Sequence, residues 1–445
     1  MTERYSSYLS PLDAAFLHVE DRNNRMQLAG VLIFDGPAPS FAEFREAISR
    51  CLPALPHFRH RLHHTAFGVL RPAWVDDDAF DLDYHLHRVS LPSPGGHAEI
   101  TGLIDHMSAD PLDLQRPLWE MTLVEGLADG GFAVALKVHH CMVDGLSIMD
   151  IFATLCSPEP ARALPQPQPW APCPPKKWWQ ISGVNPQLPK ADWEVIGRLR
   201  RIGRLIRQAP DTPFNSEVCG PTRRTEYVTV PLRDIHDIRH AYGATVNTIV
   251  LAVVTGAMRR YLSRHGELVD HLHAFVPVNR RPEHARGTHG NQIAMTYPGL
   301  PVGESDPHAR IGKVAEAVKR ATTTSQADDT AALLELGRYA PQPLAALMNR
   351  ALQFNAGMFN LTVTNVPGPP VAVYFLGRPL RLILGSTPLT RKHALTIAVV
   401  SYNGALTFSV TTDPRRLPDG TDIVADIRAE LDVLGQITTS ARRHS

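Results

Sequence analysis

Apolar and polar positions recur along this chain with two different periods, and each period predicts a different element. From Phe132 to Val138 every second residue is large and apolar, while two alanines and a lysine stand between them. That period of two is typical of a strand. After Ser40, a residue type that favours helix N-caps, apolar residues recur at positions 41, 44, 47 and 48, as they do in a helix. The same criteria predict further strands at 27–34, 121–125, 224–230, 273–278, 361–365, 380–384, 395–402 and 405–411, and helices within 9–20 and at 98–107, 146–155, 246–265 and 306–323.

Strands and helices alternate in both halves of the chain, which predicts a mixed α/β protein. The length of 445 residues suits two or three domains. Ten of the 32 residues from Pro158 to Pro189 are proline. Because proline fixes φ and lacks a backbone donor, this density disfavours both helix and sheet. We therefore predict an N-terminal domain of residues 1–157, a linker region of residues 158–215 and a C-terminal domain of residues 216–445.

The linker region also contains a predicted basic amphipathic helix, over residues 192–208. Its apolar residues fall on one side and its arginines lie mostly around the remainder. An apolar stripe with several arginines suits binding at an anionic lipid surface. A helix packed across the two domains is the alternative. The residues concerned are Trp193, Ile196, Leu199, Ile202 and Ile206 on the apolar side, and Arg198, Arg200, Arg201, Arg204 and Arg207 around it.

Composition narrows the class of protein and the expected partners. The chain has 45 basic and 44 acidic residues, a net charge of +1, so nothing in it suggests a nucleic-acid partner. Its five cysteines are scattered without a C-x-x-C pair, and we expect neither disulfides nor a zinc site. No run approaches the roughly 18 apolar residues of a spanning helix, and no signal peptide is recognisable. We therefore expect a cytoplasmic protein that meets a membrane only from its surface.

The candidate chemistry lies where the strand from Phe132 to Val138 ends. There the chain reads His139, His140, three further residues, Asp144 and Gly145. A neutral imidazole can take a proton from a hydroxyl near neutral pH, whereas a buried and satisfied histidine is the structural alternative. Since successive side chains on a strand point to opposite faces, we expect one histidine to be chemical and the other structural.

Asp144 and Gly145 are predicted to shape the loop. Asp144 lies beyond the strand and ahead of the helix at 146–155, so its expected role is the N-cap of that helix. An ion pair with Arg280 or Arg281 is a second structural possibility. Gly145 then serves a tight turn.

Cys141, next to His140, raises the possibility of a cysteine nucleophile. Adjacent side chains usually diverge, which argues against it. The chain has no G-x-S-x-G elbow, Walker loop or dinucleotide fingerprint. The commoner serine-acyltransferase and nucleotide-binding sites are therefore not predicted.

These motifs, together with five other blocks, resemble the bacterial wax ester synthase/diacylglycerol acyltransferase family. That family lies within the HHxxxDG acyltransferases, which include chloramphenicol acetyltransferase and the condensation domains of peptide synthetases. The resemblance runs from about residue 9 to residue 419. The blocks are 10–17 (SPLDAAFL), 117–120 (PLWE), 290–292 (GNQ), 365–369 (NVPGP) and 400–404 (VSYNG).

The resemblance implies two chloramphenicol-acetyltransferase-like domains of the CoA-dependent acyltransferase fold with a channel between them. It implies that His140 is the general base and that no cofactor is bound. Acyl-CoA would be the co-substrate and a diacylglycerol or a long-chain alcohol the acceptor, at the inner face of the membrane or at lipid droplets. The residues that it assigns to substrate binding or to structure are Pro117, Leu118, Trp119, Asn247, Asn365, Pro367 and Gly368.

Two positions depart from the family pattern. An Asn-Asp pair of the family appears as Asn247 and Thr248, and an asparagine before an isoleucine appears as Thr396. Two rivals to an O-acyltransferase stay open, and the departures support only the second of them. One is a condensation-type acyltransferase that uses a carrier-protein thioester. The other is a weakly catalytic lipid-binding or lipid-droplet protein that retains the fold.

Overall fold

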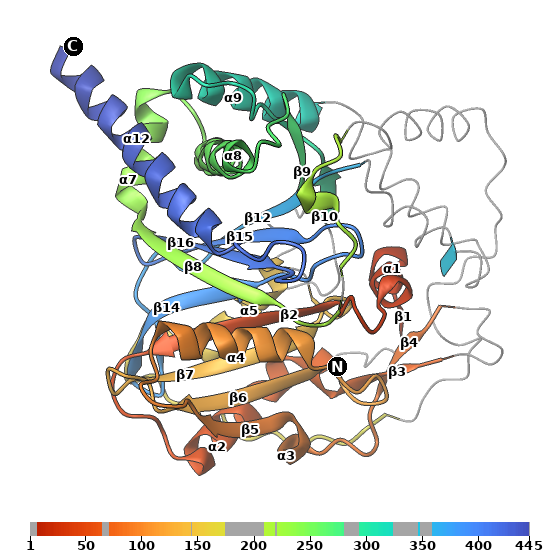
Figure 1. Cartoon of the computed structure of the whole chain (residues 1–445). Coiled ribbons are helices and arrows are strands. Elements are labelled where there is room, and N and C mark those ends of the chain that lie inside the picture. The colour runs from red at the N-terminus through yellow and green to blue at the C-terminus, as the bar shows by residue number, and fades with distance from the viewer. Residues whose placement is uncertain are drawn as a thin grey trace.

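The structure is a computed structural model that describes residues 7–64, 71–143, 145–173, 209–218, 220–279, 293–323, 346–347 and 358–444 (Figure 1). Its strands form a six-stranded sheet, a seven-stranded sheet and a small three-stranded sheet. Helices pack on the two large sheets, and this arrangement confirms the predicted mixed α/β class.

The six-stranded sheet carries the His-His stretch on its central strand. Its strands are β2 (Gln27–Phe34), β5 (Leu86–Ser90), β6 (Trp119–Glu125), β7 (Phe132–His139), β13 (Tyr374–Phe375) and β14 (Arg378–Ser386), and its helices are α2 (Phe41–Cys51), α3 (Leu82–His85), α4 (His97–Ala109) and α5 (Gly145–Leu155). The strand order is β13-β14-β2-β7-β6-β5, so β7 lies between β2 and β6 and is antiparallel to both. Every residue of β7 is buried.

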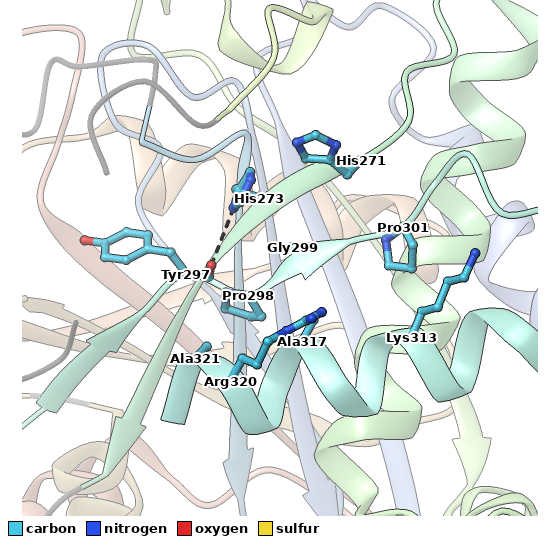
Figure 2. Close-up of a pocket in the computed structure, with 10 residues that line it drawn as sticks. All are labelled: His271, His273, Tyr297, Pro298, Gly299, Pro301, Lys313, Ala317, Arg320 and Ala321. Atoms are coloured by element: carbon cyan, nitrogen blue, oxygen red, sulfur yellow. Dashed lines mark hydrogen bonds between the residues drawn. The ribbon is translucent and has the colours of Figure 1, made fainter. Parts of the chain in front are cut away.

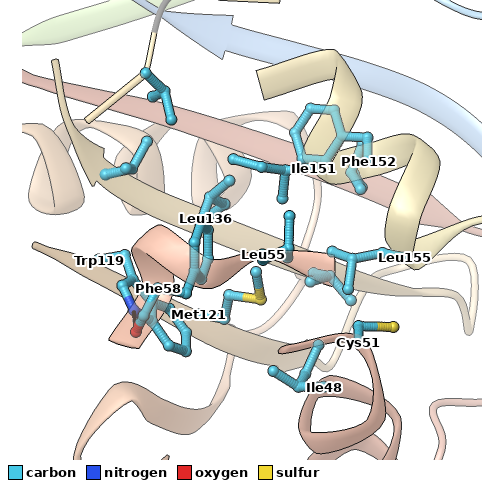
Figure 3. Packing of buried hydrophobic residues seen from close by; sticks show 14 of the residues in the cluster. Ile48, Cys51, Leu55, Phe58, Trp119, Met121, Leu136, Ile151, Phe152 and Leu155 are labelled. Carbon is cyan, nitrogen blue, oxygen red and sulfur yellow. Dashed lines mark hydrogen bonds between the residues drawn. The ribbon is translucent and has the colours of Figure 1, made fainter. Parts of the chain in front are cut away.

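The alternation along β7 divides two clusters of apolar side chains. Val134, Leu136 and Val138 belong to the larger cluster with side chains of α2 and α5 (Figure 3). The alanines between them face a smaller cluster that contains side chains of α4. Lys137, on the α4 side, is buried and pairs with Glu120 at 2.8 Å. Helices thus cover both faces of β7, so the side chains along this strand are buried on either side of the sheet.

The seven-stranded sheet forms the second half of the molecule. Its strands are β8 (Arg224–Pro231), β9 (Leu272–Asn279), β10 (Ile293–Thr296), β11 (Gly299–Leu300), β12 (Leu361–Pro367), β15 (Leu395–Tyr402) and β16 (Ala405–Thr412), and its helices are α7 (Leu232–Ala241), α8 (Val246–Arg264), α9 (Pro307–Thr323) and α12 (Asp422–His444). β12 is parallel to both β9 and β15. The four helices lie above this sheet in Figure 1, and the six-stranded sheet lies below it. Side chains of all four helices join those of the strands in one apolar core.

The hairpin of β13 and β14 crosses the predicted division into an N-terminal and a C-terminal domain. Both strands follow residue 216, yet β14 pairs with β2 along the edge of the six-stranded sheet. Leu380 and Ile383 of β14 are buried in the larger cluster of that sheet. The predicted C-terminal domain of residues 216–445 therefore supplies two strands to the other half. Periodicity predicted the strand at 380–384 but carries no information on its pairing partner.

The two halves also meet through α4, which packs against β8. His97 of α4 pairs with Glu226 of β8 at 2.6 Å. A chain of hydroxyl contacts continues the interface, from Ser108 to Ser386 at 3.5 Å and from Ser386 to Thr411 at 3.2 Å. The interface therefore combines an exposed histidine–carboxylate contact with buried hydroxyl groups.

The predicted strands and helices in the described residues are confirmed, with ends that differ by no more than two residues. The capped helix after Ser40 carries a complete capping box with Glu43. The basic helix predicted at 192–208 lies outside the described residues. Patterning did not predict β1 (Ser7–Tyr8), β3 (His60–His63), β4 (Ala73–Asp76), α3, β5, β10, β11, α7, β13, α12 or the single-turn helices Leu52–Ala54, Pro56–Arg59 and Pro213–Asn215.

Among the described residues, no single helix has the length and apolar character needed to cross a membrane. The pair α7 and α8, bent by 98°, meets that criterion only when the two are taken together. Most residues of α8 are buried in the core of the C-terminal half.

Candidate functional site

The His-His stretch straddles the end of β7. His139 is the last residue of the strand and His140 the first residue beyond it. The backbone N–H of His139 donates to the carbonyl oxygen of Leu118 at 3.0 Å, and that of His140 donates to the carbonyl oxygen of Met26 at 2.7 Å. Both neighbouring chain segments therefore fix the point at which the strand stops.

His139 has both ring nitrogens engaged inside the protein. Its Nδ1 accepts a hydrogen bond from the backbone N–H of Cys141 at 3.1 Å. The proton of the neutral ring therefore lies on Nε2, which donates to the carboxylate of Glu20 at 2.9 Å. The His139 side chain is 1% exposed and that of Glu20 11% exposed. These contacts make His139 the support of the turn and leave no ring nitrogen of His139 for a substrate.

His140 lies in a different environment, against α1 (Pro11–Val19). Its ring stacks on that of Phe16, with centroids 4.0 Å apart and an interplanar angle of 17°. The hydroxyl of Ser10 caps α1 by accepting from the backbone N–H of Asp13 at 3.0 Å. His140 is half-buried, whereas His139 is fully buried. The ring plane of His140 is thus set by a helix that the opening block of the chain forms.

Cys141 is buried beside the two histidines. Burial raises the pKa of its thiol well above the ordinary value, and the carboxylates of Asp13 and Glu20 add to the rise. A thiol with a raised pKa holds little thiolate near neutral pH, and the thiolate is the nucleophilic form. The environment therefore disfavours a cysteine nucleophile.

The block from Pro117 to Glu120 lies behind the turn. The carbonyl oxygen of Leu118 accepts from His139, as described above, and the carbonyl oxygen of Pro117 accepts from the backbone N–H of Trp119. Trp119 is fully buried, and its indole N–H donates to the carbonyl oxygen of Phe58 at 2.8 Å (Figure 3). These contacts favour the structural role over substrate binding for Leu118 and Trp119.

The block around Asn365 connects β12 with α8 and β15 in the C-terminal half. The Nδ2 of Asn365 in β12 donates to Oδ1 of Asn247 in α8 at 3.5 Å. Pro367 stands opposite Ser401 in the register of β12 and β15. The backbone N–H of Gly368 donates to the carbonyl oxygen of Ser401 at 2.9 Å, and a Cβ at position 368 would lie 2.3 Å from that oxygen. Only glycine permits this approach.

The structure brings the block at 400–404 close to the six-stranded sheet. The hydroxyl of Tyr402 donates to the carbonyl oxygen of Leu380 at 2.9 Å and accepts from the backbone N–H of Val373 at 3.1 Å. Helix α5, which follows the His-His stretch, contacts β12. Within the described residues no hydrogen bond links Asn247, Asn365 or Gly368 to His140.

The two threonines that depart from the family pattern, Thr248 and Thr396, both form hydrogen bonds within the protein. The backbone N–H of Thr248 donates to the Thr245 hydroxyl, the N-cap of α8, at 3.1 Å. Thr396 is buried in β15, and its hydroxyl donates to the carbonyl oxygen of Thr387 at 3.2 Å. Both threonine hydroxyls therefore have hydrogen-bond partners within the protein.

Several predicted residues lie outside the described part of the chain. They include Asp144, Arg280, Arg281 and the block at 290–292. Helix α5, which Asp144 was predicted to cap, begins at Gly145. In the part of the chain that the structure describes, no three His, Cys, Asp or Glu side chains are placed to hold a metal ion.

Sequence reasoning did not assign roles to Glu20 and Phe16. Glu20 is 119 positions from His139, and no spacing rule connects residues so far apart. Phe16 belongs to the block at 10–17, which the sequence singled out. Its stacking on His140 could not be predicted from that block.

Comparison with known proteins shows the family to which this chain belongs. The catalytic domain of wax ester synthase/diacylglycerol acyltransferase matches residues 9–250, and the C-terminal domain of the same family matches residues 289–435. In Mycobacterium tuberculosis, a protein named "Probable diacyglycerol O-acyltransferase tgs2" is 32% identical over 96% of this chain and 98% of its own length. Another, named "Probable diacyglycerol O-acyltransferase tgs1", is 30% identical over 94% of this chain and 92% of its own length.

Solved structures share the whole architecture. A wax ester synthase/diacylglycerol acyltransferase from Marinobacter aquaeolei matches with a TM-score of 0.72 at 26% identity, over 97% of this chain and all of that chain. The starter condensation domain of rhizomide synthetase matches with a TM-score of 0.60 at 14% identity, over 98% of this chain and 94% of that chain. The second likeness extends to the fold alone.

Proposed function

The chain belongs to the wax ester synthase/diacylglycerol acyltransferase family, and from that premise we propose that His140 is the general base of its acyl transfer. The protein is an acyltransferase, and its family implies acyl-CoA as donor together with an acyl acceptor. The proposed acceptor is the hydroxyl of a diacylglycerol or of a long-chain alcohol, and the products are triacylglycerol and wax ester.

In the proposed reaction the neutral imidazole of His140 removes the proton of the acceptor hydroxyl. The acceptor oxygen attacks the thioester carbonyl carbon and forms the new ester bond, and the carbon–sulfur bond breaks. The proton passes from the imidazolium to the departing CoA sulfur. No acyl-enzyme forms. The burial of Cys141, which keeps its thiol protonated, supports this direct transfer.

The observation that carries the proposal is the division between the two histidines. Glu20 and the Cys141 backbone occupy the nitrogens of His139. His140 is half-buried, lies just beyond the end of the strand, and has its ring plane held by stacking on Phe16. A positioned base of this kind contributes on the order of a hundredfold to ten-thousandfold in rate.

The test is single-turnover transfer from acyl-CoA by His140→Ala and His139→Ala, each beside a thermal melt. We expect His140→Ala to remain folded and to lose about 10²–10⁴-fold in rate, with little change in acyl-CoA binding. His139→Ala should lose stability, because the carboxylate of Glu20 would be buried without its partner. A folded but inactive His139→Ala beside a normally active His140→Ala would reverse the assignment. Activity in both variants would refute the proposed mechanism.

The acceptor is tested by supplying dioleoylglycerol or hexadecanol with labelled acyl-CoA and separating the lipid products. Ester formed with either acceptor identifies the corresponding activity. A product formed only from a carrier-protein thioester would support the condensation-type rival. Acyl-CoA binding with no product from any acceptor would support the lipid-binding rival.

We also propose that the protein works at the inner face of the membrane or at lipid droplets, since its acceptors are lipids. The support is the sequence of residues 192–208, with its apolar stripe and arginines. Replacing Arg200, Arg201 and Arg204 with glutamine should weaken binding to anionic vesicles and reduce the salt dependence of what remains. Unchanged vesicle binding would instead favour a helix packed between the domains.

A further inference from the structure

A cavity of about 470 Å³ lies in the C-terminal half, between α9 and the neighbouring strands β9 and β11 (Figure 2). Its size falls within the range of sites for small organic molecules. None of the residues that line it belongs to the His-His stretch or to the family blocks described above. The acyl-transfer chemistry therefore leaves this cavity without a role.

Basic side chains border the cavity on two sides. His271 directly precedes β9 and His273 is its second residue, whereas Lys313 and Arg320 come from α9. Among the described residues that line the cavity, none carries a carboxylate. Lys313 pairs with Glu304 at 2.5 Å, which partly neutralises it. Arg320 is exposed and has no ion pair with another described residue.

The floor between these basic groups is small and apolar. It consists of Pro298, Gly299 and Pro301 on the strand side and of Ala317 and Ala321 on the helix side. Their side chains carry no hydrogen-bonding groups. The two alanines lie one turn apart on the face of α9 that also carries the basic residues. A flat apolar group can lie on such a floor without leaving a polar atom unsatisfied.

His273 adds one directional polar group. Its Nδ1 donates to the carbonyl oxygen of Tyr297 at 3.5 Å, so the neutral ring carries its proton on Nδ1 (Figure 2). Burial lowers the pKa of His273 below its ordinary value of 6.5, which favours that neutral form. Its Nε2 is therefore an acceptor for an N–H or O–H group of a ligand.

From this arrangement we propose that the cavity binds a nucleotide carrying a phosphate monoester. The phosphate meets the guanidinium of Arg320, because arginine matches the geometry of phosphate oxygens. The base lies on the proline and alanine floor, with an N–H or O–H donor directed to His273. Seven residues of helix rise roughly 10 Å, so Lys313 and Arg320 span the length of a nucleoside phosphate.

Two sources can supply this chemistry. One is the 3′-phosphoadenosine end of coenzyme A, and that source rests on the proposed function. The other is a free nucleotide that binds apart from the reaction. The two share a phosphate on an adenosine, so adenosine 3′,5′-bisphosphate is a suitable probe for both.

The experiment measures equilibrium binding of adenosine 3′,5′-bisphosphate and of inorganic phosphate to the full chain by calorimetry. Arg320→Gln removes the proposed phosphate contact, Arg320→Lys keeps the charge, and Lys319→Gln is a matched control on the same helix outside the cavity. We expect the bisphosphate to bind wild type and Lys319→Gln alike. It should bind Arg320→Gln on the order of tenfold or more weakly, with Arg320→Lys between, and should bind wild type more tightly than phosphate alone.

The source is then decided by steady-state kinetics on the same variants. A raised KM for acyl-CoA at unchanged kcat in Arg320→Gln supports the coenzyme A source, and an unchanged KM with lost bisphosphate binding supports the free nucleotide. The proposal is overturned if wild type does not bind the bisphosphate, if Arg320→Gln binds it equally, or if phosphate binds as tightly. Binding needs no turnover, so an inactive but folded His140→Ala protein that still binds the probe separates this site from the proposed function.

Discussion

The two adjacent histidines differ in what surrounds them more than in where they stand in the sequence. His139 completes a chain of contacts from Glu20 to the backbone of Cys141, within a site that is almost wholly buried. A hydrogen bond to a charged group contributes about 1.5–3 kcal/mol, and a buried carboxylate without its partner is costly. We therefore expect Glu20 to be a positioning residue that acts on His140 through the turn.

Glu20→Gln should lower both the melting temperature and kcat while leaving the KM for acyl-CoA nearly unchanged. The reason is that a neutral amide holds the Nε2–H of His139 less firmly, so the turn that carries His140 loosens. Steady-state kinetics at a temperature where the variant remains folded would measure this. Glu46→Gln is the control, because Glu46 pairs with Arg50 at the surface of α2 and such pairs contribute little. A normal kcat with a lowered melting temperature would make Glu20 purely structural.

Much of the site could be predicted from the sequence, and the remainder depended on distant contacts. The period of two from Phe132 onward predicted the strand, and it predicted that His139 and His140 would part. Glu20, Phe16 and the carbonyl oxygen of Leu118 could not be assigned, because they reach the histidines across 119, 124 and 21 positions. Local periodicity reports which face of an element is buried, and it does not report which other segment buries it.

Among the elements, α4 and β8 form a contact between the halves that contains a buried carboxyl group. Asp105 of α4 lies against Thr225 of β8. Burial raises the pKa of Asp105 to about 7, although hydrogen bonds from Thr225 oppose the rise. The unfolded chain releases this proton at a pKa of about 3.9. Between these two values the folded protein holds more protons than the unfolded chain, so stability falls as pH rises through that window, and the full penalty is present above about pH 7.

Asp105→Asn should remove that penalty, because the amide stays neutral at every pH. We expect its melting temperature to exceed that of wild type at about pH 8, and the difference to shrink at about pH 5. Thermal melts at the two pH values measure the effect. Asp78→Asn, at an 80% exposed side chain, is the control and should show no such dependence. An equal difference at both pH values would show that the carboxyl of Asp105 is not the group that titrates.

The hairpin of β13 and β14 makes the two halves of the molecule depend on each other. The predicted boundaries at 157 and 216 follow from composition, because they flank the proline-rich stretch. The pairing of β14 with β2 crosses those boundaries. The residues from beyond 216 that enter the larger apolar cluster of the six-stranded sheet are Val373, Phe375, Leu380, Ile383, Val400 and Tyr402.

Residues 1–190 expressed alone should therefore fail to form a stable folded protein. Each large apolar side chain stabilises by about 1.5–3 kcal/mol when buried, so the loss of six is on the order of 10 kcal/mol, which is comparable to the whole stability of a typical domain. The edge of β2 would also stand open, and exposed apolar edges promote aggregation. Co-expression with residues 191–445 should restore a soluble complex with acyltransferase activity, since the hairpin then returns to β2. The measurement is solubility, cooperative thermal unfolding and activity of the fragment alone and of the co-expressed pair. A monomeric fragment 1–190 that unfolds cooperatively without its partner would show that the hairpin is dispensable and that the N-terminal half is an independent domain.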